Sequence, residues 1–175
     1  ARRMGGKPKG LGLRNGLSLI EHLARLVPED EIRLVGGAKS LYEPLGYHWV
    51  ADKMPNRGAP GGLLTALESS STPWVRILAC DLPLMTRSVI DDLKPIENRH
   101  VVLYVVNGRP QYLVSLWHVS ALHTLSACLQ AESPGFRTIL SQLKVQQVVS
   151  KSVEAFTNMN DESAARQAGV RWLKH

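Results

Sequence analysis

The pattern of hydrophobic and polar positions alternates along this chain between segments with helical spacing and short segments typical of β-strands. Apolar side chains recur on one face at helical spacing in four segments, residues 19–27, 63–67, 118–130 and 136–143. Short β-prone apolar runs occupy residues 33–35, 47–51, 74–80, 101–106, 112–117 and 145–149. Because strands and helices alternate, the pattern predicts an α/β domain with a mostly parallel sheet.

Polar residues and glycines mark where several of these elements begin or end. Ser18 precedes the first helical run and is predicted to cap it, and Asp161 is predicted to cap the last helix. Gly46 closes a short predicted helix over residues 40–45. The Asn107-Gly108 pair lies between two strands, so it predicts a hairpin or a short excursion from the parallel order.

The length and composition are typical of one globular domain. The 175 residues, 44% hydrophobic and 21% charged, can bury one sizeable core, so we expect a single domain over residues 1–175. The net charge of +6 favours anionic partners, either nucleic acid or phosphorylated small molecules. The sequence has no basic stripe interleaved with aromatics and no zinc-finger or RNA-binding signature, so we expect no nucleic-acid partner.

The cysteines and the apolar runs indicate the cellular compartment of the protein. Cys80 and Cys128 stand in no metal or redox spacing, which fits a reducing cytoplasm better than a disulfide scaffold. The longest aliphatic run, residues 101–106, is far too short to span a bilayer. We therefore expect a cytoplasmic protein with no membrane partner.

The first ten residues gather cationic side chains around two glycines. Gly5 and Gly6 allow a tight turn and a close approach to a ligand, and the cations around them are Arg2, Arg3, Lys7 and Lys9. Backbone N–H groups, the arginine fork and the lysine point charge together suit a phosphate group. The alternative is a disordered basic terminus.

Two further stretches suit a phosphorylated ligand. Residues 52–62 are rich in Pro and Gly and precede the helical run at residue 63, so they predict a loop at a helix N-terminus, which favours an anion. Asp81 follows the strand at 74–80, and an acid at that end of a central strand faces the ligand crevice of α/β sheets. Asp81 is alternatively a cap or turn residue, although the next helix starts only near Thr86.

Four short motifs occur in order along nearly the whole chain. They are residues 2–9 (RRMGGKPK), 58–63 (GAPGGL), 80–83 (CDLP) and 156–160 (FTNMN). Together they resemble the signatures of the molybdenum cofactor guanylyltransferase (MobA-type) family of nucleotidyltransferases. The resemblance implies the nucleotide-diphospho-sugar transferase-like fold, with a three-layer, Rossmann-like, mostly parallel sheet and helices on both of its faces.

The resemblance also implies a reaction. The terminal phosphate of molybdopterin attacks the α-phosphate of GTP, which releases pyrophosphate and leaves a guanine dinucleotide cofactor. The implied cofactor is Mg²⁺, and the implied partners are GTP, molybdopterin and molybdoenzyme-maturation proteins. Such an enzyme must gather many negative charges and stabilise more on the leaving group.

The motif positions assign roles to individual residues. The match implies that Arg3, Lys9 and Asp81 are catalytic and that Asp81 also holds the metal, because Mg²⁺ prefers one or two carboxylates with phosphate oxygens and water. The other implied nucleotide-binding residues are Arg2, Met4, Gly5, Gly6, Gly61 and Gly62. The implied acceptor-binding residues are Arg137, Asn158 and Asn160, and simple turn chemistry is the alternative for the two asparagines.

The chain departs from the family pattern in several places. Pro8 stands where relatives have an acid before the motif lysine, and Gly36-Gly37 occupies a strand end where they often carry an asparagine for the base. Pro55-Asn56 stands near the place of an aspartate. The family's first strand and the start of its nucleotide loop should precede Ala1, so we expect about ten to fifteen further residues there, forming a strand whose absence would expose its neighbours' edges.

Two other classes of function stay open. A related nucleotidyltransferase that uses CTP, or another phosphorylated acceptor, would keep Arg3, Lys9 and Asp81 and differ in the base loop, although Gly61-Gly62 favours the guanine type. A non-catalytic nucleotide-binding module is the second alternative, and Pro8 favours it.

Overall fold

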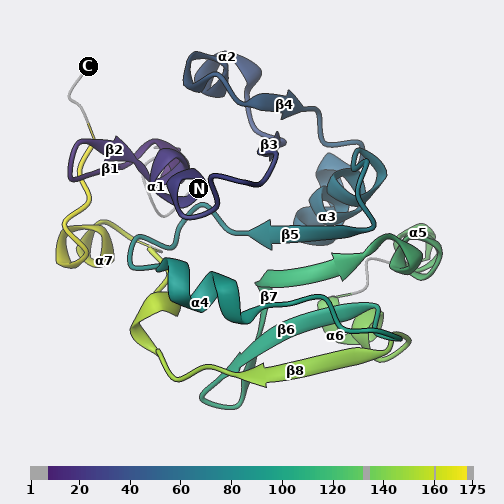
Figure 1. Cartoon of the computed structure of the whole chain (residues 1–175). Coiled ribbons are helices and arrows are strands. Elements are labelled where there is room, and N and C mark those ends of the chain that lie inside the picture. Colours follow the sequence, from purple (N-terminus) through teal and green to yellow (C-terminus); the bar gives the residue numbers. More distant parts are fainter. Residues whose placement is uncertain (1–7, 132–134, 160, 173–175) are drawn as a thin grey trace.

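A four-stranded sheet forms the centre of the domain (Figure 1). The computed structural model describes residues 8–131, 135–159 and 161–172. The strand order is β5-β7-β6-β8, with bounds Trp74–Leu78 (β5), Arg109–His118 (β7), Val101–Val106 (β6) and Val145–Val149 (β8). β6 and β8 are parallel, and β7 runs antiparallel to both β5 and β6. Three of the four strands therefore share one direction, which confirms a mostly parallel sheet.

The one antiparallel strand follows the predicted hairpin turn. Asn107 and Gly108 both have positive φ, 49° and 72°. Two consecutive residues of this conformation match the right-handed twist of paired strands, so the chain reverses at once from β6 into β7. β7 then lies between β5 and β6.

Two smaller strand pairs flank this sheet. β3 (Arg33–Val35) and β4 (His48–Val50) are parallel to each other and form a separate two-stranded sheet. β1 (Leu13–Arg14) and β2 (Leu17–Ser18) form a short antiparallel hairpin that the hydrophobic pattern does not predict. This hairpin joins the first described turn to the first helix.

Helices cover both faces of the central sheet. Their bounds are Leu19–Arg25 (α1), Lys39–Tyr42 (α2), Gly58–Glu68 (α3), Arg87–Asp92 (α4), Leu122–Gln130 (α5), Phe136–Leu140 (α6) and Glu162–Gln167 (α7). One buried cluster joins α1 and α4 to one face, and a second cluster joins α3, α5 and α6 to the other. The three-layer arrangement is thereby confirmed.

The central strand β6 shows why the sheet is buried on both sides. Val102 and Tyr104 belong to the cluster on one face, and Val101 and Leu103 to the cluster on the other. All four side chains are at most 1% exposed. A continuous apolar run is the pattern of a strand whose two faces are both covered.

β5 differs from its prediction. Its apolar run predicts a strand buried on both faces, yet every residue of β5 is only half-buried. Among the described residues β5 pairs only with β7, so its second edge has no neighbouring strand. An uncovered edge exposes the side chains on both faces.

The predicted helix caps are present. Ser18 Oγ accepts a hydrogen bond from the Glu21 amide, and the Glu21 carboxylate accepts bonds from the Ser18 hydroxyl and amide. The bond from the hydroxyl, followed by the bond from the amide, lowers the pKa of Glu21. Asp161 caps α7 through the Ala164 amide, and Gly46 ends the short helix before β4 in the left-handed conformation. Among the described residues no helix is long and apolar enough to cross a membrane.

Candidate functional site

The polar residues singled out from the sequence cluster at one edge of the central sheet. β5, β6 and β8 share a direction, so their carboxyl ends lie at the same edge. The turn at Asp81 follows β5, the hairpin at Asn107 follows β6, and the segment with Asn158 follows β8. In open α/β sheets this edge is where ligands bind.

Lys9 and Asp81 form an ion pair at this edge. Lys9 Nζ lies 2.8 Å from Asp81 Oδ2, although the two residues are 72 positions apart. The side chains are 23% and 18% exposed, so solvent reaches both. A partly exposed pair of this kind contributes about 1 kcal/mol or less to stability. It is therefore weak enough for a ligand to separate.

Packing fixes the segment that carries Lys9. Lys9 opens a short turn, residues 9–11, and Gly10 within it is buried. A Cβ at Gly10 would lie only 2.7 Å from Ile20 Cδ1 and 3.4 Å from Cys80 Cβ. Only glycine allows the turn to pack this closely against α1 and the turn after β5.

The end of the chain also holds this segment. Trp172 Nε1 donates a hydrogen bond to the Pro8 carbonyl at 3.1 Å, and Leu13 exchanges backbone hydrogen bonds with Arg171. Sequence reasoning missed Gly10 and Trp172. The only sign of Gly10 in the sequence is that a glycine directly follows the motif at residues 2–9. Nothing in the sequence indicated that Trp172 packs against the segment of Lys9.

Asp81 is fixed by the residues that follow it and by the segment after β8. Leu82 and Met85 are both 2% exposed and anchor the turn in the core. His22 Nε2–H of α1 donates to the Met85 carbonyl at 3.2 Å, and burial lowers the pKa of His22. The Met159 amide donates to the Asp81 carbonyl at 3.0 Å, which brings the adjacent Asn158 to the same edge.

Cys80, beside Asp81, has an exposed surface but a crowded thiol. The residue lines a cavity beside β5, and the surrounding protein shields the thiol from water. Burial, followed by the charge of Asp81, raises the pKa of the Cys80 thiol. Because the thiolate is the reactive form, the rise argues against Cys80 as a nucleophile.

The second glycine-rich stretch corrects a prediction. α3 begins at Gly58, so Gly61 and Gly62 lie in the first turns of this helix and not in a loop before it. Gly61 is buried, and a Cβ there would collide with the Met54 carbonyl, so it serves the packing of the helix. Gly62 is half-buried, with Val35 as its nearest neighbour at 4.0 Å from its Cβ position.

Gly36 and Gly37 form the turn after β3. Both have positive φ, 77° and 70°, and the Gly36 carbonyl accepts a hydrogen bond from Trp49 Nε1. A Cβ at Gly37 would come within 2.6 Å of the Tyr42 ring. Gly37 therefore leaves room for the Tyr42 ring.

The remaining predicted residues are not brought to the Lys9–Asp81 pair. Arg137 is exposed on α6, and the neighbouring Phe136 stacks on Tyr112. Among the described residues, no hydrogen bond or ion pair links Arg137 to Asp81. Six predicted residues lie outside the described ones: Arg2, Arg3, Met4, Gly5, Gly6 and Asn160.

A single carboxylate is the metal donor that this edge offers. Among the described residues no group of three or more His, Cys, Asp or Glu side chains could hold a metal ion. Lys9 bonds to Oδ2 of Asp81, and no described side chain donates to Oδ1. One carboxylate fits Mg²⁺ when phosphate oxygens and water complete its octahedron. The donor set therefore suits a metal that arrives with a nucleotide.

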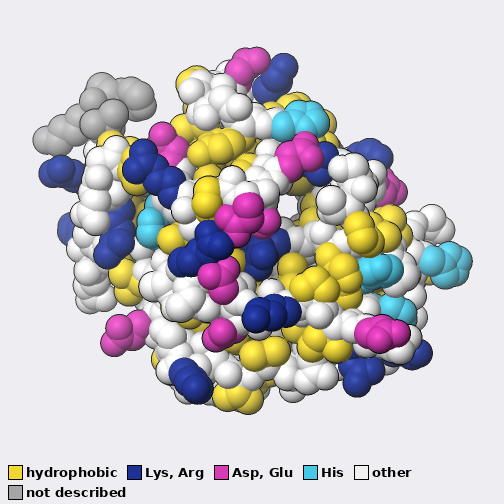
Figure 2. Space-filling model, in the orientation of Figure 1, with side chains coloured by type: hydrophobic (Ala, Val, Ile, Leu, Met, Phe, Trp, Pro, Cys, Tyr) yellow, Lys and Arg dark blue, Asp and Glu magenta, His cyan; other side chains and the backbone are white. Residues whose placement is uncertain are grey.

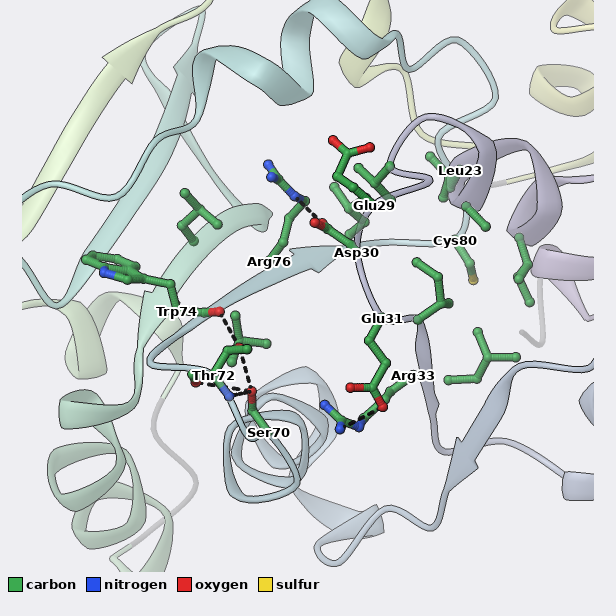
Figure 3. A pocket seen from close by; sticks show the side chains of 18 of the residues that line it. Leu23, Glu29, Asp30, Glu31, Arg33, Ser70, Thr72, Trp74, Arg76 and Cys80 are labelled. Carbon is green, nitrogen blue, oxygen red and sulfur yellow. Dashed lines mark hydrogen bonds and ion pairs between the residues drawn. The ribbon is translucent and has the colours of Figure 1, made fainter.

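A slot lies between β5 and the β3–β4 sheet (Figure 3). It is a cavity of about 440 Å³ that extends along β5 from Trp74 to Cys80. Two ion pairs stand at its walls, Arg76–Asp30 at 2.9 Å and Arg33–Glu31 at 2.8 Å. The two arginines of the slot are therefore already paired with carboxylates.

Charges of both signs mix on the surface that Figure 2 presents. Lys and Arg side chains lie among Asp and Glu and form no continuous basic stripe on this face. Among the described residues, Arg87 pairs with both Glu29 and Asp91. This face lacks the continuous positive charge that nucleic-acid backbones require.

Comparison with known proteins decides the family. The model of the MobA-like NTP transferase domain matches residues 1–148. The chain belongs to this family. A probable molybdenum cofactor guanylyltransferase of Flavobacterium johnsoniae is 27% identical over 158 residues, which cover 87% of this chain and 83% of the relative. The molybdenum cofactor guanylyltransferase of Haemophilus influenzae is 35% identical over 98 residues, 54% of this chain and 51% of that protein.

Solved structures agree on the fold of this family member. The molybdopterin-guanine dinucleotide biosynthesis protein A of Archaeoglobus fulgidus has a TM-score of 0.79 at 18% identity, with 95% of this chain and 91% of that one covered. A nucleotidyl transferase from Methanothermobacter has a TM-score of 0.74 at 17% identity, with 96% and 90% covered. The nucleotide-diphospho-sugar transferase fold predicted from the motifs is thereby confirmed.

The packing of Gly10 gives a prediction. Gly10→Ala adds a methyl group where Ile20 and Cys80 leave no room, so we expect a loss of about 1–3 kcal/mol in the free energy of unfolding. Urea denaturation measures this loss. Gly135→Ala is the matched control, because Gly135 has no neighbour within 4 Å and ordinary φ. An equal loss in both variants would contradict the close packing at Gly10.

Proposed function

We propose that the protein is a molybdenum cofactor guanylyltransferase, which transfers GMP from GTP to the terminal phosphate of molybdopterin and releases pyrophosphate. The observation that carries the proposal is the Lys9–Asp81 pair at the carboxyl edge of the sheet, in a chain of the MobA-like family. The names of its relatives from Flavobacterium and Haemophilus supply the substrates.

Lys9 and Asp81 have complementary tasks in this reaction. Lys9 is a compact positive charge at the carboxyl edge of the sheet. When a nucleotide binds, Lys9 leaves Asp81 and pairs with the nucleotide phosphates instead. Asp81 then offers its carboxylate to Mg²⁺. The ion, when bound, neutralises phosphate charge and stabilises the leaving pyrophosphate. We assign Arg2, Arg3, Met4, Gly5 and Gly6 to the same nucleotide.

The acceptor lies on the other side of Asp81. Asn158 is exposed and follows β8, and the next residue, Met159, is hydrogen-bonded to Asp81. We therefore assign Asn158, together with Asn160, to the phosphate end of molybdopterin. Arg137 is exposed on α6, so its assignment to the acceptor rests on the motif match alone.

The proposal also covers the guanine site, the location of the protein and the fate of its product. Gly61 and Gly62 lie in the first turns of α3, so their proposed contribution to the guanine site is the close approach of this helix N-terminus. A cytoplasmic location and transfer of the product to molybdoenzyme-maturation proteins remain predictions.

A turnover assay tests the proposed function. With Mg²⁺ and molybdopterin present, we expect the protein to release pyrophosphate from GTP and to release far less from CTP. Release with CTP at an equal or higher rate would favour the cytidylyl alternative. No release with any nucleotide, together with tight nucleotide binding, would favour a non-catalytic module.

Removing the carboxylate charge tests the metal role of Asp81. Asp81→Asn keeps the size of the side chain but weakens metal binding, so we expect a fall in kcat of about 100-fold or more with an unchanged fold. Asp92→Asn is the control, because Asp92 is exposed at the end of α4. Circular dichroism checks the fold. Turnover of Asp81→Asn near that of the control would remove Asp81 from the mechanism.

We further propose that residues preceding Ala1 form a strand in the slot. Among the described residues β5 pairs only with β7 and β3 only with β4, so both strands leave an edge unpaired. The slot reaches Cys80, which packs against Gly10. A strand that leaves the slot there continues into the segment that carries Lys9, as the family pattern requires.

Hydrogen exchange tests this strand. Ala79 and Pro73 bond to β7, so by alternation the N–H groups of Arg76 and Leu78 face the slot. We expect these two amides to exchange much more slowly in a protein that carries the preceding residues than in the 175-residue chain. The Ile77 amide faces β7 and is the internal control. Equally fast exchange of Arg76 and Leu78 in both proteins would rule out a paired strand.

A further inference from the structure

A second hollow lies at the carboxyl edge, beside the segment that carries Asn158. It is a cavity of about 470 Å³ between the β6–β7 hairpin and the segment after β8. Arg109 and Gln111 line it from the hairpin, and Val153, Phe156 and Thr157 line it from the opposite side. Volumes of 300–1,000 Å³ are usual for small-molecule sites.

The polar groups of this hollow are available to a ligand. Arg109 is exposed, and no described residue accepts a hydrogen bond from its guanidinium. Gln111 Nε2 donates to the Arg109 carbonyl at 3.1 Å, which orients the amide and leaves Oε1 as an acceptor. A guanidinium stacks well on flat rings, and an amide can both donate to and accept from a ring edge.

Apolar surface stands opposite these groups. Val153 is 49% exposed, and Phe156, whose amide donates to the Val153 carbonyl at 3.2 Å, is buried in the core. A guanidinium on one side and an exposed aliphatic side chain on the other suit a flat heterocycle better than a compact phosphate. Arg109 is the only charged side chain among the residues that line the hollow.

The hollow is connected to the proposed reaction centre. Thr157 lines it, Asn158 follows, and the Met159 amide donates to the Asp81 carbonyl. An acceptor whose phosphate lies near Asp81 and Asn158 can therefore extend along this segment into the hollow. In the proposed function the nucleotide binds on the Lys9 side of Asp81, so it does not need this space.

We propose that the hollow binds the fused nitrogen heterocycle of the acceptor, with Arg109 stacked on the ring and Gln111 hydrogen-bonded to its edge. This inference rests on the proposed function, because that function supplies a phosphorylated acceptor with such a ring. It adds two specificity-determining residues that the four motifs do not contain.

Steady-state kinetics of the full-length protein test the two residues. For Arg109→Ala and Gln111→Ala we expect the KM for molybdopterin to rise about 10-fold or more, while the KM for GTP stays unchanged. Arg109→Lys keeps the charge but loses the flat fork, so it should recover only part of the loss. Lys151→Ala is the control, because Lys151 is exposed on the same segment but does not line the hollow.

Two kinetic outcomes would overturn the inference. A rise in the KM for GTP alone would mean that the nucleotide base occupies the hollow. An unchanged KM for molybdopterin in both alanine variants would mean that the hollow binds nothing in this reaction.

A binding measurement separates this inference from the proposed function. If the unmodified protein shows no turnover with molybdopterin, fluorescence titration with a free pterin still probes the hollow. Binding that weakens in Arg109→Ala but not in Lys151→Ala supports the heterocycle site even when the proposed reaction fails. Equal binding in all variants, or none, contradicts the site.

Discussion

The site depends on the ion pair between Lys9 and Asp81, and the fold depends little on it. The pair is partly exposed, so its contribution to stability is small. Its two members also have contacts of their own: the bond from Trp172 to Pro8 holds the segment of Lys9, and the bond from Met159 holds Asp81. A ligand can therefore separate the two charged groups by side-chain movement, while the backbone at both residues stays in place.

The separate contacts on the two sides of Asp81 explain how one edge can serve two substrates. The segment before α1 approaches Asp81 from one side, and the segment after β8 approaches it from the other (Figure 1). A nucleotide on the Lys9 side and an acceptor on the Asn158 side would meet at one carboxylate. Their negative charges repel, so a cation and a metal ion are needed at that meeting point.

The sequence predicts the elements that local chemistry decides. Continuous apolar runs identified β6, and the capping box of Ser18 identified the start of α1, because both signals lie within a few neighbouring residues. The motif match identified Lys9 and Asp81 for the site. The half-buried state of β5, the start of α3 at Gly58, and the roles of Gly10, Trp172 and Arg109 depend on contacts between distant segments, which periodicity does not encode.

A crystal structure of the full-length protein with GTP and Mg²⁺, solved without acceptor, tests the central claim most directly. The account predicts a metal ion held by the Asp81 carboxylate and phosphate oxygens, Lys9 Nζ on a phosphate, and the 2.8 Å ion pair opened. A nucleotide bound away from both side chains, with that ion pair intact, would contradict it.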